Sequence, residues 1–262
     1  MVELRGDWRT VWFALLKLTP KRIDRAALQV GSKLGSVQFT GTHETTRNLD
    51  VLKQAGIPIP VQTTTFSVTA ADKEWASAFL ATHQIDREQP LIAIHPGSPI
   101  ELKRWLPERY AELADWLIAQ KGAQILFVGV KDEIQIITDI QALMRGESIS
   151  IASETSLTQL ASILHRCNVF IGNDSGPMHL AAAVGTQTIG LYGPGDPTRF
   201  GPVGVKCQTI RMKPDCPPCP GPTCRFGADG CMSKIQVTDV IQTLEAAAYL
   251  TGDDERSPIK TN

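Results

Sequence analysis

The feature that most constrains the fold is a repeated alternation of short strand-like runs with amphipathic helical segments. It begins at Leu91 with LIAIH and continues to Tyr192. This alternation is typical of an α/β protein with a doubly wound, Rossmann-like parallel sheet. The strands are predicted at 91–95, 124–128, 148–152, 168–172 and 188–192, and the helices among them at 107–121, 133–144, 157–166 and 177–184.

The flanking regions contain fewer predicted elements. A Pro- and Gly-rich loop is expected from 193 to 231, because no clear apolar period is present there. We therefore expect a small first domain over 1–65, a larger second domain over 66–250, and a disordered polar tail over 251–262. The remaining predictions are a strand at 2–4 and helices at 8–17, 43–54, 70–83 and 238–249.

Charge and hydropathy exclude some classes of protein. The net charge of -1 argues against the broad basic surface of a nucleic-acid binder. No apolar run near the start approaches the roughly 20 residues of a membrane span, and Glu3 and Asp7 stand where a signal peptide is basic. We expect a cytoplasmic protein. Seven basic residues against three acidic ones within 1–36 suit peripheral contact with an anionic membrane or glycan, or an ordinary solvated face.

Polar residues follow four of the predicted strands. These stretches are 96–98, 129–133, 173–176 and 193–196. Parallel strands place their carboxyl ends along one edge of the sheet, where ligands bind in open α/β folds. The sequence therefore predicts a ligand crevice at this edge.

The segment NDSGPMH is the most informative of these strand ends. Asp174 or Ser175 is predicted to cap the following helix with its side chain, and Gly176 allows a ligand to approach the backbone. The start of such a helix suits a diphosphate, and His179 can donate to a phosphate oxygen. The alternative is a well-capped helix with a core histidine.

Two charged residues fit the same crevice. Lys103 can neutralise a pyrophosphate or be solvated, and Glu133 can accept from a ribose hydroxyl or complement a helix dipole. Trp105 is expected to pack. Neither of the glycine-rich phosphate motifs of dinucleotide-binding proteins and P-loop enzymes is present.

A cysteine cluster lies in the loop over 214–232. The spacing C-x2-C-x4-C-x6-C is compatible with a structural zinc site, with an iron–sulfur cluster as an alternative and reduced thiols as the simplest interpretation. The four residues are Cys216, Cys219, Cys224 and Cys231.

Five segments together resemble one family. HPGS, LKRWLPERYAELADWL, FVGVKDE, SLTQLASILHRCNVFIGNDSGPMHLAAAVG and GLYGPGDPTRFGP occur in the order found in the ADP-heptose:lipopolysaccharide heptosyltransferases, glycosyltransferase family nine. The resemblance is strong over 91–249 and weaker over 2–60. It implies a GT-B architecture, in which two Rossmann-like domains face a cleft, here with the first domain truncated.

The resemblance also implies a reaction and its residues. A heptose-type sugar would pass from an ADP-sugar to a lipopolysaccharide core acceptor, with inversion and without a required cofactor or metal. The C-terminal domain would hold the donor, with Lys103 at its phosphate and Glu133 at its ribose. The donor-binding set carried over is Ser98, Lys103, Glu133, Asp174, Ser175, Gly176 and His179.

The first domain departs from the family. The resemblance starts midway through it, and no residue matches the acidic residue usually assigned as the base, so the catalytic residue is unassigned. The alternatives are a non-catalytic nucleotide-sugar or metal-binding module and, less favoured, an epimerase of the same architecture. Acceptor-side candidates are Arg5, Arg9, Arg25, His43 and Arg47.

Overall fold

The protein is described by a computed structural model. It places residues 2–3, 23–24, 40–54, 56–59, 64–212, 219, 224, 226–227 and 230–247. The chain divides into two compact units, one formed by Met1–Thr63 with Thr198–Phe200 and the other by Thr64–Pro197 with Gly201–Asn262. The helix predicted at 8–17 and the tail predicted at 251–262 lie outside the described residues.

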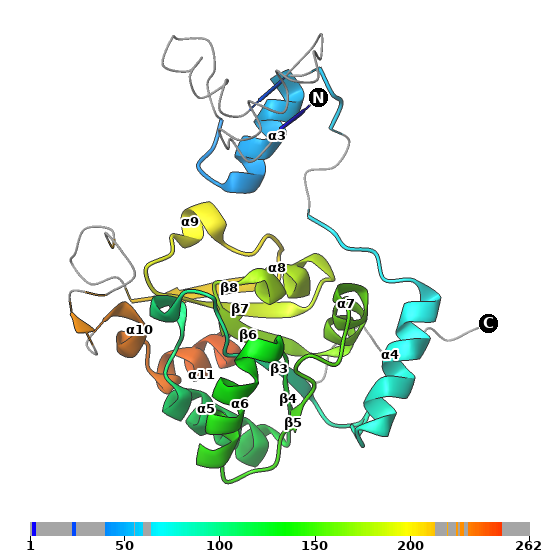
Figure 1. Cartoon of the computed structure of the whole chain (residues 1–262), viewed down its shortest axis with the longest axis vertical. Helices are drawn as coiled ribbons and strands as arrows, with labels where there is room; N and C mark the ends of the chain where they lie inside the picture. The colour runs from blue at the N-terminus through cyan, green and yellow to red at the C-terminus, as the bar shows by residue number, and fades with distance from the viewer. Residues whose placement is uncertain are drawn as a thin grey trace. The chain divides into compact units, whose positions relative to one another are not determined.

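The larger unit is built on a six-stranded sheet in which every neighbouring pair is parallel (Figure 1). The strand order is β5-β4-β3-β6-β7-β8, so the order along the chain reverses between β3 and β6. This is the doubly wound arrangement that the sequence predicts. The strands are β3 Leu91–His95, β4 Gln124–Phe127, β5 Ile149–Ser150, β6 Val169–Asn173, β7 Gln187–Tyr192 and β8 Cys207–Arg211.

Helices cover both faces of this sheet. Alternate residues of β3 point to opposite faces, so Ile92 and Ile94 join one apolar core while Leu91 and Ala93 join the other. The first core is closed by α5 (Pro107–Lys121), α6 (Ile134–Leu143) and α11 (Val237–Ala246). The second is closed by α4 (Ala70–Thr82), α7 (Leu157–Arg166) and α8 (Gly176–Ala183).

The predicted loop over 193–231 is wrong in part, because it contains the edge strand β8. Only Ile210 of this strand is buried, so no apolar run marks it in the sequence. Its pairing with β7 comes from backbone hydrogen bonds, which any non-proline residue supplies. Short helices also occur in this region and before α5 and α6: α9 (Pro197–Phe200), α10 (Cys231–Lys234), η1 (Glu101–Lys103) and η2 (Lys131–Glu133).

The smaller unit contains α3 (Glu44–Gln54) and a parallel pair, β1 (Val2–Glu3) with β2 (Ile23–Asp24). Asp50 of α3 is buried, and its carboxylate accepts hydrogen bonds from the backbone N–H and the hydroxyl of Thr40 at 2.8 and 2.9 Å. These bonds fasten the segment before α3 to the helix.

Asn173, the last residue of β6, joins three parts of the larger unit. Its amide nitrogen donates to the carbonyl oxygens of Pro96 and Gly97 at 2.7 and 3.3 Å. Its amide oxygen accepts from the backbone N–H of Trp105 and the hydroxyl of Tyr110 at 3.1 and 3.0 Å. The side chain is fully buried, so these bonds have no competition from bulk water. The end of β6, the loop after β3 and the start of α5 are thereby held together.

Replacing this amide should destabilise the unit strongly. Asn173→Ala leaves the buried Trp105 N–H without its acceptor and the Tyr110 hydroxyl with only the His95 carbonyl, 3.5 Å away, and we expect the free energy of unfolding to fall by about 2–4 kcal/mol. Urea denaturation followed by circular dichroism measures it. The exposed Gln208→Ala is the control and should change stability by less than about 0.5 kcal/mol. A loss below about 1 kcal/mol for Asn173→Ala would contradict this account.

Candidate functional site

The candidate site lies where the strand order reverses. The chain leaves β3 for α5 on one face of the sheet and leaves β6 for α8 on the other face. Diverging connections open a crevice at the carboxyl ends of the two strands. The residues that end or follow these strands here are His95, Ser98, Asn173, Asp174 and Ser175.

An ion pair crosses this crevice. The ammonium nitrogen of Lys103, in η1, lies 2.6 Å from Oδ2 of Asp174, which follows β6. Asp174 is 8% exposed and Lys103 is 24% exposed, so the pair is only partly open to water. Gly195 packs against the same carboxylate, since a Cβ there would lie only 2.5 Å from Oδ2. A lysine ammonium has three hydrogens, so Lys103 can donate to an anion while it still contacts Asp174.

Helix α8 begins beside this pair without a side-chain cap. The prediction that Asp174 or Ser175 caps the helix is therefore wrong. The Asp174 carboxylate is paired with Lys103, and the Ser175 hydroxyl contacts Nδ1 of His95 and the carbonyl of Asn173, each at 3.0 Å. A helix start with no side-chain acceptor keeps its partial positive charge for an anionic ligand.

Glu133, at the end of η2, is a negatively charged residue of the crevice, in contrast to the positive start of α8. Its Oε2 accepts from the backbone N–H of Val130 at 2.9 Å and from Nε2 of His95 at 3.0 Å. Burial alone would raise the pKa of this carboxyl. The hydrogen bond and charge of His95, the Val130 N–H and the charge of Arg104 outweigh burial and hold the pKa below its ordinary value of 4.5. Glu133 is therefore an ionised acceptor at neutral pH.

Gly97 packs closely against Glu133. A Cβ on Gly97 would overlap the Glu133 carboxylate, with less than 3 Å to three of its side-chain atoms. A side chain at this position of HPGS would therefore displace the Glu133 carboxylate from its contacts with His95 and Val130.

His95 is a site residue that the sequence reasoning missed. It is 2% exposed, and its two ring nitrogens contact Ser175 and Glu133. The available signal was a histidine at the last position of the apolar strand LIAIH. Asn173 was expected at the crevice as part of the polar stretch 173–176, but its bonds to the loop after β3 and to the start of α5 were not predicted.

The other predicted donor-binding residues occupy different environments. Ser98 is buried, and its hydroxyl accepts from the backbone N–H of Ile100 at 3.2 Å, so it shapes the loop. Gly176 and His179 are exposed on α8. Trp105 packs, as predicted: it is 1% exposed and its Nε1 donates to the carbonyl of Ile235 at 3.0 Å.

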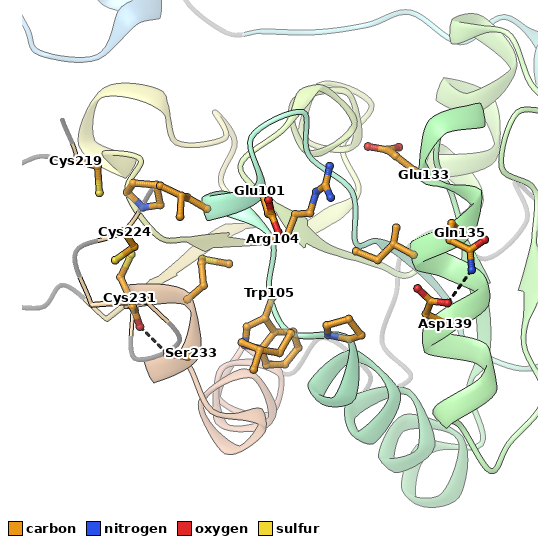
Figure 2. Close-up of a pocket in the computed structure, with 18 of the residues that line it drawn as sticks. Glu101, Arg104, Trp105, Glu133, Gln135, Asp139, Cys219, Cys224, Cys231 and Ser233 are labelled. Carbon is orange, nitrogen blue, oxygen red and sulfur yellow. Dashed lines mark hydrogen bonds between the residues drawn. The ribbon is translucent and has the colours of Figure 1, made fainter. Parts of the chain in front are cut away.

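A cleft of about 560 Å³ adjoins the crevice (Figure 2). Its walls come from η1, the start of α5, the first turns of α6 and the region around α10. Of the predicted donor-binding residues, Glu133 alone lines it. The cleft and the crevice are thus neighbouring features that share one carboxylate.

Three of the four predicted zinc ligands lie on one wall of this cleft, as Figure 2 shows. Burial, followed by the proximity of Cys219 and Cys224, raises the pKa of the Cys231 thiol above its ordinary value of 9.0. The described part of the chain contains no group of three or more His, Cys, Asp or Glu residues placed to hold a metal ion. Cys216 lies outside it, and the zinc site stays a prediction.

The predicted acceptor-side residues lie in the smaller unit. Nδ1 of His43 accepts from the backbone N–H of Thr45 at 3.2 Å, at the start of α3. Arg47 lies 3.8 Å from Glu44 one turn earlier on this helix. Both contacts are local, within the first turns of α3 and the residue before it. Arg5, Arg9 and Arg25 lie outside the described residues.

The lowered pKa of Glu133 makes stability depend on pH. An ionised Glu133 stabilises the fold at pH values above about 4.5, and this contribution is lost as pH falls through the lowered pKa. Glu133→Gln removes it, so the free energy of unfolding should fall more steeply between about pH 5 and pH 3 in the parent protein than in the variant. Urea denaturation at each pH measures both curves. The neighbouring, exposed Asp132→Asn is the control, and parallel curves for parent and Glu133→Gln would contradict the assignment.

Comparison with known proteins places these features in a family. The model of glycosyltransferase family 9 (heptosyltransferase) matches residues 22–228. Lipooligosaccharide heptosyltransferase 2 of Haemophilus influenzae is 38% identical over 129 residues, which are 48% of this chain and 37% of that protein. The chain thus spans little more than a third of the length of this relative.

Solved structures show the same fold. The structure of E. coli ADP-heptose lps heptosyltransferase II matches with a TM-score of 0.71 and 23% identity, covering 94% of this chain and 75% of that one. E. coli heptosyltransferase WaaC with ADP matches with a TM-score of 0.57 and 20% identity, covering 81% and 59%. The fold is therefore GT-B-like. None of the helices within the described ranges has the length and hydrophobicity of a membrane span. The family match covers well over half of the sequence, and the chain belongs to glycosyltransferase family 9, the heptosyltransferases.

Proposed function

We propose that the larger unit holds an ADP-sugar and that the whole protein transfers a heptose from it to a lipopolysaccharide core. The observation that carries this proposal is the Lys103–Asp174 pair beside the start of α8, which has no side-chain cap. Family membership supports it, as do relatives that are named for ADP-heptose and lipopolysaccharide or solved with ADP. The proposed domains are 1–65 for the acceptor, 66–250 for the donor and 251–262 as a tail.

Each donor group has a chemically matched partner in this proposal. Lys103 donates to the diphosphate, which lies at the start of α8 beside Ser175 and Gly176, within reach of His179. Glu133 is an ionised acceptor beyond β4 and accepts from the ribose hydroxyls. Asp174 accepts from hydroxyls of the sugar, and Ser98 shapes the loop that contacts the phosphates.

The proposed chemistry is an inverting displacement. The acceptor hydroxyl oxygen attacks the anomeric carbon, the bond from that carbon to the β-phosphate oxygen breaks, and ADP leaves with the electron pair. The charge of Lys103 and the dipole of α8 stabilise the growing negative charge on the diphosphate, which is why no metal is required in this scheme. A general base takes the hydroxyl proton. No residue of this chain is assigned to that role.

The proposed acceptor is the lipid-linked core oligosaccharide, at the inner face of the inner membrane. Cationic side chains in the smaller unit suit a phosphorylated glycan, because arginine pairs with phosphate through two parallel hydrogen bonds. The candidates remain Arg5, Arg9, Arg25, His43 and Arg47. Turnover of ADP-heptose with such an acceptor tests this part, and donor binding without turnover would favour a non-catalytic module.

The donor proposal predicts selective binding of adenine nucleotide. Calorimetric titration of the 262-residue protein should show tighter binding of ADP than of UDP or GDP. Lys103→Met keeps the apolar stem but removes the charge, and we expect ADP affinity to fall about 10- to 100-fold, the worth of one charge-assisted hydrogen bond.

Lys121→Met is the matched control for this titration. Lys121 ends α5, about 20 Å along the helix from the end nearest the crevice, and pairs with Glu245. Its substitution should leave ADP affinity unchanged. Asp174→Asn should weaken binding of the ADP-sugar more than binding of ADP. Unchanged donor affinity in both Lys103→Met and Asp174→Asn would remove the site assignment.

A further inference from the structure

We propose that His95 is a positioning residue that couples Glu133, on the ribose side of the donor site, to Ser175, on the diphosphate side. Each of these two groups is held in its orientation by one nitrogen of the same imidazole. The inference rests on the proposed donor site and adds to it a residue with no direct contact to the donor.

The sheet explains why this position can bridge both groups. Strand β3 lies between β4 and β6, and His95 is its last residue. Glu133 comes from the connection after β4, and Ser175 comes directly after β6. A side chain at the end of the middle strand can therefore reach a partner beyond each neighbouring strand. Nε2 of His95 lies 3.0 Å from Oε2 of Glu133, and Nδ1 lies 3.0 Å from Oγ of Ser175.

The backbone of His95 is closely confined. It pairs with Gly172 of β6, and a Cβ on that glycine would lie 2.9 Å from the His95 carbonyl oxygen. With 2% of the residue exposed, the ring has little room to change its orientation. The imidazole therefore presents its two nitrogens at positions set by the central strands of the sheet.

The hydrogen-bonding capacity of the three groups makes the contacts interdependent. The ionised Glu133 carboxylate only accepts, so Nε2 carries the hydrogen in this contact. The Ser175 hydroxyl has one hydrogen, and both Nδ1 of His95 and the carbonyl of Asn173 lie 3.0 Å from its oxygen. The ring therefore influences which way the hydroxyl hydrogen points at the start of α8. Among the described residues Glu133 and Ser175 share no hydrogen bond of their own, so coupling between them passes through His95.

A double-mutant cycle on ADP affinity tests this coupling. Glu133→Gln and Ser175→Ala are made singly and together, and the four dissociation constants are measured by calorimetry. In the parent background we expect the combined loss to differ from the product of the single losses by at least about threefold, as is usual for residues in one hydrogen-bond network. In a His95→Ala background, the loss of ADP affinity in the double variant should equal the product of the two single losses within experimental error.

His95→Gln is the second background, because a glutamine amide can replace Nε2 but not Nδ1. In the His95→Gln background, Glu133→Gln should still lower ADP affinity, but its effect should no longer depend on Ser175→Ala. This background replaces His95→Ala if the alanine variant does not fold. His83→Ala is the matched control, since His83 makes a similar contact with Glu154, at 3.2 Å on the surface. Its background should retain the parent coupling. Multiplicative losses in the parent, or coupling that persists in both His95 backgrounds, would overturn the proposal.

A measurement without nucleotide separates this inference from the donor proposal. In the free protein, ¹⁵N NMR of the His95 ring should show a shift at Nδ1 on Ser175→Ala and at Nε2 on Glu133→Gln. A folded parent protein that shows both shifts but binds no ADP would remove the donor assignment and leave the bridge in place. Ring nitrogens that respond to neither substitution would remove the bridge, whatever the affinity for ADP.

Discussion

The buried amide of Asn173 is the interaction on which the rest of the candidate site depends. It uses its donor and acceptor atoms at once, joining the end of β6 to the carbonyls after β3 and to the start of α5. The backbone hydrogen bonds of a parallel sheet position only the strands. The loops that follow the strands are positioned by other contacts. The hydrogen bonds of Asn173 hold the loop after β3 in place. Lys103, in this loop, and His95, at the end of β3, therefore keep fixed positions beside the start of α8.

Around the Asn173 amide, the crevice contains charged groups of both signs, and each of them has a partner. Lys103 contacts Asp174, and Glu133 contacts His95 and a backbone N–H. Paired groups avoid most of the cost of partial burial, yet each pair includes an atom that can also serve a ligand. The start of α8 adds positive charge from the backbone alone. In the proposed function, these fixed dipoles and short ion pairs are the groups that would contact the diphosphate of the donor.

Much of this could be predicted from residues read along the chain. Helix α5 begins at Pro107 and ends before Gly122, whose φ of 60° places it in the left-handed region, and both boundaries were predicted. Lys103, Glu133 and Asp174 were expected in the segments that follow the strands, and the structure places them there, while their roles in donor binding stay predictions. The edge strand β8 could not be predicted, because its exposed residues carry no apolar period and its pairing depends on β7.

The sequence by itself determined the strand-and-helix rhythm, the family, and the strand ends at which polar chemistry gathers, because these follow from local periodicity and from motifs in a set order. Only the tertiary structure decided what each polar group does there. The Ser175 hydroxyl contacts His95 instead of capping α8, and the Asp174 carboxylate pairs with Lys103. Those choices depend on partners 80 and 71 residues away, which no local pattern specifies.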